Sequence, residues 1–271
     1  MSQPAVSAQI RKLERALGHS LFDRTGRSLT LTPEGRVVLD YADEIFSLGR
    51  ELSDTLKGRL EGRPLRLVVG VTDSIPKIII YHLLQPAFDM EDPVRFVVRE
   101  DRHDHLLGQL ATHELDLVLS DMPIPPHISV QAYNHVLGES EIGIFGREDL
   151  AAPLIDNFPD SLDGAPFLLH TDGYPLRRSL DDWFAARRIQ PVPVAEFADS
   201  ALIRVFAEAG QGLFAAPSLI ADEICEKFGV LLIGTASGIR ERYYAITGER
   251  RIKHPAVAAI SEGARAKLFT P

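Results

Sequence analysis

Three aspartates stand where apolar, strand-like segments give way to helical patterns. Asp73 follows "LRLVVGVT", Asp121 follows "LDLVLS" and Asp199 follows "VAEFA". Carboxylate oxygens at such junctions suit a hard cation, because hard cations prefer oxygen ligands. Alternatively, Asp73 and Asp199 cap helices, since an aspartate in front of a helix accepts hydrogen bonds from its first N–H groups. The residue types leave both possibilities open.

The first eighteen residues have the pattern of a basic amphipathic helix. Ser2 can cap it, Pro4 fits the first turn, and Gly18 ends the pattern. One face carries apolar residues at helical spacing, namely Val6, Ile10, Leu13 and Leu17, and the other carries Gln3, Ser7, Gln9, Arg11 and Lys12. A polar, basic face of this kind suits contacts with base edges or phosphates, and a solvated surface helix is the alternative.

Other residues that could do chemistry give weaker signals. His103, Asp104, His105 and His113 suggest a metal site, but their helical pattern with polar flanks favours a solvated face. The sequence has no nucleophile elbow, zinc-protease helix or Walker motif, so we expect neither an enzyme nor a cofactor. Cys225 is the single cysteine and lies in a helical pattern, which predicts a small core residue in a cytoplasmic protein.

The basic segment continues into a short hairpin and a long helix. Two strand-like pieces around Gly26 predict a hairpin with Arg24 and Arg27 at its tip. From Pro33 to about Lys57 apolar residues recur at spacings of three and four, which predicts a helix with an apolar stripe and no core of its own. Such a stripe favours pairing with a second copy of the chain. The segment "KGRLEGRP" then breaks the pattern and is interpreted as a linker.

From Leu65 onward strand patterns alternate with helical patterns, which predicts an α/β fold with a parallel sheet. The first helix of this part is expected from about Ser74 and the last from about Pro255. The proline-rich "MPIPPH" separates a first group of strands from a second. Two α/β lobes joined by crossover strands would form a cleft in which a small ligand could bind.

Charge divides the chain into a basic head and an acidic body. The 271 residues carry a net charge of −9, yet residues 1–30 hold five cations against two anions. The remaining residues therefore carry −12, and the head keeps a local positive field that suits nucleic acid. No apolar run approaches the roughly 18–20 residues of a membrane span, so no membrane partner is expected.

The segment "SQPAVSAQIRKLERALGHSLFDRTGRSLTLTPEG" resembles the DNA-binding part of LysR-type transcriptional regulators: recognition helix, wing and start of the linker helix. The body resembles their two-lobed effector-binding domain, which is similar to type 2 periplasmic binding proteins. Five segments resemble the subgroup that activates a sodium/proton antiporter gene, namely "YADEIFSLGREL", "VGVTDSIPK", "LDLVLSDMPI", "EFADSALIRVFA" and "ERRIKHPAV". The family places a further helix and most of the next before this point, so we expect the N-terminus to be truncated.

The resemblance implies an organisation and a set of sites. Residues 1–32 would be a partial winged helix-turn-helix DNA-binding domain, 33–63 a linker and dimerisation helix with a hinge, and 64–271 the effector-binding domain. Lobe I would cover about 64–139 and 241–271, and lobe II about 140–240. DNA contacts are expected from Gln3, Ser7, Arg11, Lys12, Arg24 and Arg27, and dimer contacts from Tyr41, Ile45, Leu48 and Leu52.

Effector contacts are implied at strand ends: Thr72, Asp73, Ser74, Ser120, Asp121, His170, Thr171, Asp199 and Ser200. Many family members bind small organic anions there, using hydroxyls and helix N-termini. The three aspartates would repel an anion, which instead favours a cation such as sodium near Asp73 and Asp121.

The function implied is that of a DNA-binding transcriptional regulator, an activator of sodium/proton antiporter or related stress genes. It would act in the cytoplasm as a homodimer or tetramer on double-stranded DNA, respond to a small effector and contact RNA polymerase. Two other functions are considered: a stand-alone ligand-binding protein of periplasmic-binding-protein-like fold with a vestigial DNA-binding segment, and an α/β enzyme that uses the cleft.

Overall fold

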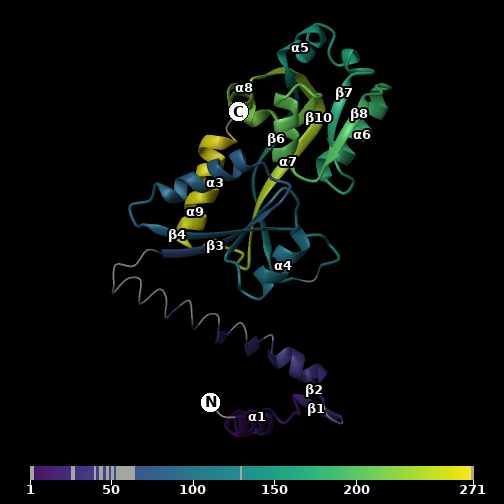
Figure 1. The fold of residues 1–271 in the computed structure, drawn as a ribbon. Coiled ribbons are helices and arrows are strands. Elements are labelled where there is room, and N and C mark those ends of the chain that lie inside the picture. Colours follow the sequence, from purple (N-terminus) through teal and green to yellow (C-terminus); the bar gives the residue numbers. More distant parts are fainter. Residues whose placement is uncertain are drawn as a thin grey trace. The chain divides into compact units, whose positions relative to one another are not determined.

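The computed structural model describes residues 3–25, 28–39, 41–42, 45–46, 49, 52, 65–128 and 130–269 (Figure 1). The chain divides into two compact units, Met1–Arg63 and Pro64–Pro271, and each is described by itself. The predicted wing residue Arg27, the predicted dimer contact Leu48 and the predicted linker "KGRLEGRP" lie outside the described residues.

The first unit begins with a helix and a hairpin, as predicted. Helix α1 spans Gln3–Leu17 and ends at Gly18, whose φ of +75° is a left-handed conformation that glycine adopts without strain. Strands β1, Phe22–Thr25, and β2, Ser28–Leu31, pair antiparallel. The side chain of Glu14 joins the two elements, because its Oε1 accepts the backbone N–H of Leu21 at 2.8 Å.

A second helix follows the hairpin and begins at Pro33. Thr32 caps it: its hydroxyl accepts the N–H of Gly35 at 2.9 Å and donates to the carbonyl of Ser20 at 2.8 Å. A Cβ atom at Gly35 would lie 2.0 Å from the carbonyl oxygen of Leu21, so this close approach of helix and hairpin requires glycine. The described residues from 33 to 52 are helical.

A six-stranded sheet of order β4-β3-β5-β10-β6-β9 organises the second unit. Its strands are β3 (Leu65–Thr72), β4 (Val94–Asp101), β5 (Leu117–Ser120), β6 (Tyr133–Arg147), β9 (Phe214–Pro217) and β10 (Val230–Thr247). The prediction of a parallel sheet is right for β4, β3 and β5. It is wrong for the rest, because β10 runs antiparallel to both β5 and β6, and β6 runs antiparallel to β9.

Helices cover both faces of the parallel part of the sheet. Helices α3 (Lys77–Phe88) and α9 (Pro255–Gly263) lie together on one face, and α4 (His103–Ala111) lies on the other (Figure 1). Alternate residues of β3 serve the two faces: Leu67 and Val69 belong to the core with α3 and α9, whereas Val68 packs with Leu106 and Leu107 of α4.

The other half of the second unit adds a pair of parallel strands, β7 (Pro166–His170) and β8 (Val192–Phe197). Helices α6 (Pro175–Arg187) and α7 (Ser200–Glu208) pack against this pair, whereas α5 (Glu148–Ala151) and α8 (Ala221–Phe228) contact β10. Cys225 lies in α8, half-buried against the core. The long strands β6 and β10 pass through both halves, and their register breaks between Thr235 and Arg240. No helix in the described part of the chain is long and apolar enough to cross a membrane.

Candidate functional site

One face of α1 presents polar and basic side chains, as predicted. Arg11 and Lys12 are exposed and Ser7 is half-buried. The apolar stripe on the other side is also partly open, with Val6 at 41% and Leu13 at 44% exposure. For Gln3 and Arg24 the structure describes only the backbone, in α1 and β1, so their expected DNA contacts stay predictions.

The helix that starts at Pro33 carries an exposed apolar stripe. Tyr41, Ile45 and Leu52 are 63%, 67% and 61% exposed, and Phe46 is 67% exposed. Large apolar side chains in such a row are costly to leave in water, and burying them against a second helix is the usual solution. The assignment of Tyr41, Ile45 and Leu52 to a dimer contact remains a prediction.

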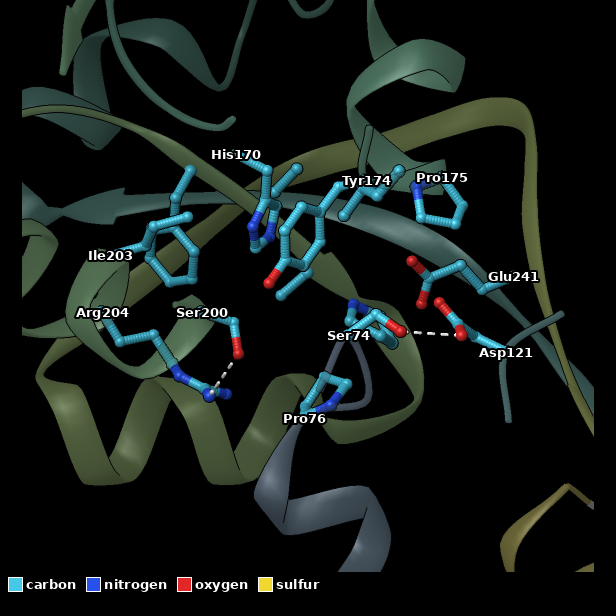
Figure 2. A pocket seen from close by; sticks show the side chains of 15 residues that line it. Ser74, Pro76, Asp121, His170, Tyr174, Pro175, Ser200, Ile203, Arg204 and Glu241 are labelled. Carbon is cyan, nitrogen blue, oxygen red and sulfur yellow. Dashed lines mark hydrogen bonds between the residues drawn. The ribbon is translucent and has the colours of Figure 1, made fainter. Parts of the chain in front are cut away.

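A cleft in the second unit gathers residues from the ends of several elements (Figure 2). It is partly open to solvent, and the volume accessible to water within it is about 20 Å³. Its lining comes from the segments that follow β3, β5 and β7, from the start of α7, from β9 and from β10. Of the predicted effector contacts it includes Ser74, Asp121, His170 and Ser200.

One end of the cleft is acidic. Asp121 Oδ1 accepts hydrogen bonds from the Ser74 hydroxyl at 2.7 Å and from the Thr72 hydroxyl at 3.2 Å. Glu241 of β10 lies beside it, partly buried, and Glu241 Oε2 accepts a hydrogen bond from the buried Tyr243 hydroxyl at 2.8 Å. Burial and the negative charge of Asp121 raise the pKa of the Glu241 carboxyl to about 7, although the Tyr243 hydrogen bond lowers it.

The other end is basic. Arg204 of α7 is 4% exposed, and its guanidinium lies 3.4 Å from the Ser200 hydroxyl, to which it donates. It also lies over the ring of Phe228, at 5.7 Å from the ring centre. Burial lowers the pKa of Arg204 and the charge of Asp199 raises it, but an arginine stays protonated under such conditions.

His170 and Tyr174 form part of the lining between these ends. Their rings stack with centroids 4.7 Å apart and planes 13° apart, and the Tyr174 hydroxyl donates to the carbonyl of Ala198. His170 is 8% exposed, and burial together with the positive charges of Arg204 and Arg177 lowers its pKa to about 4. The imidazole is therefore neutral near pH 7 and adds no charge to the cleft.

The remaining predicted effector residues do not line the cleft. The hydroxyl of Thr72 donates to Asp121, whereas Ser120 is buried, with its hydroxyl 2.9 Å from His103 Nδ1. Thr171 is half-buried and its backbone N–H donates to the carbonyl of Phe197. The side chain of Asp199 is exposed and caps α7, because its Oδ1 accepts the N–H of Ala201 at 2.7 Å.

Asp73 is not the helix cap that was one of its two interpretations. The helix after β3 begins at Lys77 instead of near Ser74, with Pro76 as its cap residue, so Asp73 is not a helix cap. Proline explains the later start, because Pro76 disfavours a helical conformation for the residue before it. The side chain of Asp73 is exposed, but local desolvation of its carboxyl and the negative charges of Glu100 and Asp121 raise its pKa.

No metal-binding cluster of three or more histidine, cysteine or acidic side chains occurs within the described residues. Asp104, His105 and His113 are exposed, as expected for a solvated face, but His103 is buried and bonded to Ser120. This part of the prediction was wrong because His103 is the first residue of α4 and faces the sheet with Leu106 and Leu107.

Among the polar lining residues, sequence reasoning missed three: Tyr174, Arg204 and Glu241. A signal was present for two of them. Arg204 stands next to Ile203 on the buried side of an otherwise apolar helix face, and Glu241 shares strand parity with the buried Tyr243 and Ala245. A charge placed on a buried face is uncommon without a partner or a ligand.

The two units together define a class of protein: a basic helix with a hairpin, a further helix, and an α/β unit with a cleft lined by charged side chains. Residues 1–36 match the family model described as "Bacterial regulatory helix-turn-helix protein, lysR family", and residues 61–268 match "LysR substrate binding domain". The chain belongs to the LysR family and is a LysR-type transcriptional regulator. Of the three functions considered above, these matches therefore favour the transcriptional regulator over the stand-alone binding protein and the enzyme.

Individual relatives agree with this assignment. The chain is 32% identical to the "Transcriptional activator protein NhaR" of Escherichia coli K12, over all of this chain and 89% of that protein. Its fold is similar to the crystal structure of ArgP from Mycobacterium tuberculosis, with a TM-score of 0.65 at 20% identity, covering 98% of this chain and 88% of that one. The structure of CbnR, a LysR family transcriptional regulator, gives a TM-score of 0.59 at 17% identity, covering 98% and 91%.

Proposed function

We propose that this regulator binds double-stranded DNA through the polar face of α1 and activates transcription when a small effector occupies the cleft of the second unit. The observation that carries the proposal is the cleft, where charged side chains from separate elements border one space that opens to solvent. Ligand sites in regulators and enzymes commonly combine apolar walls with a few polar groups in this way.

A relative supports activation instead of repression, and the exposed apolar residues of the helix that begins at Pro33 support self-association. The activator role is supported by the E. coli relative at 32% identity, and sodium/proton antiporter or related stress genes are the targets that the resembling segments suggest. The exposed stripe of Tyr41, Ile45 and Leu52 supports a homodimer or tetramer. Such a regulator would act in the cytoplasm, where its DNA lies, and contact RNA polymerase.

We expect Arg11→Ala and Lys12→Ala to weaken DNA binding in different ways. An arginine that reaches a base edge contributes discrimination of about 1–3 kcal/mol, so Arg11→Ala should flatten sequence preference. A lysine on a phosphate contributes sequence-independent affinity, so Lys12→Ala should lower the salt slope by about one. Fluorescence titration of duplexes selected by the unaltered chain from a random library, at several salt concentrations, measures both effects.

The matched control for these variants is Arg66→Ala, which removes an exposed arginine from β3 in the other unit. It should bind the selected duplexes as the unaltered chain does. If Arg11→Ala and Lys12→Ala also bind with unchanged affinity and salt slope, α1 is not the DNA-reading element.

A sodium ion is the second candidate for the effector. Asp121, Ser74 and Thr72 bring three side-chain oxygens together at the acidic end, and Asp73 adds negative charge nearby. Under this candidate, sodium chloride should raise the melting temperature more than potassium chloride at equal ionic strength, because a specifically bound ion stabilises the folded chain. Differential scanning fluorimetry measures the difference, and Asp121→Asn or Asp73→Asn should remove it.

Equal shifts from the two salts in the unaltered chain would leave only general screening of charge and would exclude sodium as the effector. The exposed Glu226 on α8 supplies a control, since Glu226→Gln removes one negative charge without touching the acidic end.

A further inference from the structure

The cleft has opposite charges at its two ends. In Figure 2 the guanidinium of Arg204 lies beside Ser200 on one side, and the carboxylates of Asp121 and Glu241 lie on the other. Ser74 and Pro76 lie between them in this view. Because the charged groups line one cleft without forming an ion pair with each other, a molecule that enters the cleft meets a positive end and a negative end.

Arg204 is built as a site for an anion. Its side chain is 4% exposed, yet no carboxylate in the described part of the chain lies within ion-pair distance of it, and its buried Nε has no hydrogen-bond acceptor there. Arg177 shows the contrast, since its guanidinium pairs with Asp181 at 2.9 Å and Glu196 at 2.8 Å and donates to the carbonyl of His170. A buried guanidinium normally has partners of this kind.

The Ser200 hydroxyl and the amino end of α7 lie near Arg204 and could also bind an anion. Ser200 is the first residue of α7, so its hydroxyl and the amino end of a nine-residue helix lie close to the guanidinium. Helix N-termini attract negative groups through their unpaired N–H donors and their dipole. Asp199, which would oppose an anion there, is exposed, caps the helix and is not part of the lining.

The acidic end is built as a site for a cation that donates hydrogen bonds. Asp121 and Glu241 lie close enough for the charge of one to raise the pKa of the other. Within the described residues, neither carboxylate has an arginine, lysine or histidine within ion-pair distance, whereas the nearby Glu139 pairs with Arg240 and with Arg242. A positive group placed between Asp121 and Glu241 would relieve their repulsion.

We propose that the effector is a small zwitterion of the amino-acid class, with its carboxylate bound by Arg204, Ser200 and the amino end of α7 and its ammonium group bound by Asp121 and Glu241. This inference rests on the proposed function only in taking the cleft as the effector site. A simple organic anion would leave the two carboxylates facing each other, and a sodium ion would leave Arg204 without an anionic partner. A zwitterion satisfies both ends.

The test compares zwitterions with their two halves on the full chain. Differential scanning fluorimetry with the protein amino acids, β-alanine, 4-aminobutyrate and 5-aminopentanoate finds the binding members. Each binder is then titrated by calorimetry beside its carboxylate-only and amine-only analogues, pentanoate and butylamine in the case of 5-aminopentanoate. The zwitterion should bind at least about tenfold more tightly than either half, because a hydrogen bond to a charged group contributes at least a factor of this order.

Single substitutions test the basic end and the acidic end of the cleft separately. Arg204→Gln should weaken the zwitterion at least about tenfold and leave the weak binding of the amine unchanged. Asp121→Asn should weaken the zwitterion similarly and leave the carboxylate analogue unchanged. Glu241→Gln and Ser200→Ala test the same ends with smaller changes in case Arg204→Gln fails to fold. Arg178→Gln on α6 and Glu226→Gln on α8, both exposed, are matched controls and should bind normally.

Three results would overturn the inference: no zwitterion of the panel binds, the carboxylate analogue binds as tightly as the zwitterion, or the amine analogue does. The proposed function fails separately. A zwitterion that binds the cleft and leaves DNA affinity and the DNase footprint unchanged would contradict an effector role while leaving the ligand class intact.

Discussion

The double variant Ile45→Glu, Leu52→Glu is expected to sediment as a smaller particle than the unaltered chain. Both side chains lie on the helix that begins at Pro33 and are more than 60% exposed, as is Tyr41. Burying such a side chain against a partner helix contributes roughly 1.5–3 kcal/mol, and each substitution acts in every copy of the assembly. Charges placed in that contact would also repel each other across it. Analytical ultracentrifugation measures the change.

The control is Arg36→Glu, an exposed charge reversal on the same helix, which should keep the assembly intact. Unaltered sedimentation of the double variant would show that this stripe is not the contact between copies. The melting temperature of the second unit should stay the same in both variants, because it is a separate compact unit of the chain.

The second large effect is a pH dependence of stability with opposing contributions from Glu241 and His170. The carboxyl of Glu241 has a pKa of about 7 against an ordinary 4.5, so between these values the folded chain holds a proton that the unfolded chain has lost. The free energy of unfolding therefore falls as the pH rises through this range. His170 has a pKa of about 4 against 6.5, so between these values the unfolded chain holds the extra proton and stability rises with pH.

Because the two ranges overlap, the unaltered chain should show a nearly flat profile between about pH 4.5 and 6.5, and single variants should reveal each slope. Glu241→Gln should be more stable than the unaltered chain near pH 8, by on the order of 1–3 kcal/mol, and should match it below about pH 4.5. His170→Phe keeps a ring against Tyr174 and should be the more stable chain near pH 4. Urea unfolding followed by the fluorescence of Trp183, the single tryptophan, measures these differences.

The exposed Glu226→Gln variant should follow the profile of the unaltered chain at every pH, because its carboxyl is in solvent. Three coincident profiles for the unaltered chain, Glu241→Gln and His170→Phe would mean that the surroundings of the two groups do not shift their titration.

The positions of most helices and strands could be predicted from the sequence, because they follow from local patterns. The spacing of Val6, Ile10 and Leu13 marks α1, and the β-branched run of Leu65–Thr72 marks β3. Strand direction and length could not be predicted in this way. The segments "EIGIFG" and "RYYAIT" are only parts of β6 and β10. In the remaining residues of these strands, glycine and charged residues interrupt the apolar pattern, and the two strands are held by pairing with each other.

The site could be predicted only where topology alone brings residues together. Ser74 and Asp121 follow the neighbouring parallel strands β3 and β5, so their meeting follows from strand order. Arg204 and Glu241 reach the cleft from the middle of a helix and of a strand, and only tertiary packing decides that their side chains face it. Asp73 and Asp199 stand at the expected junctions, but their side chains are exposed and do not line the cleft.

The place of β10 in the sheet also matters for how the chain is made. Residues 230–247 leave the ribosome after every other strand of the sheet, yet they fill the gap between β5 and β6. Until then the edges of β5 and β6 keep unpaired N–H and C=O groups that other strands can join. A nascent chain that stops before β10 therefore cannot complete the sheet, and it exposes apolar edges that chaperones must shield from aggregation.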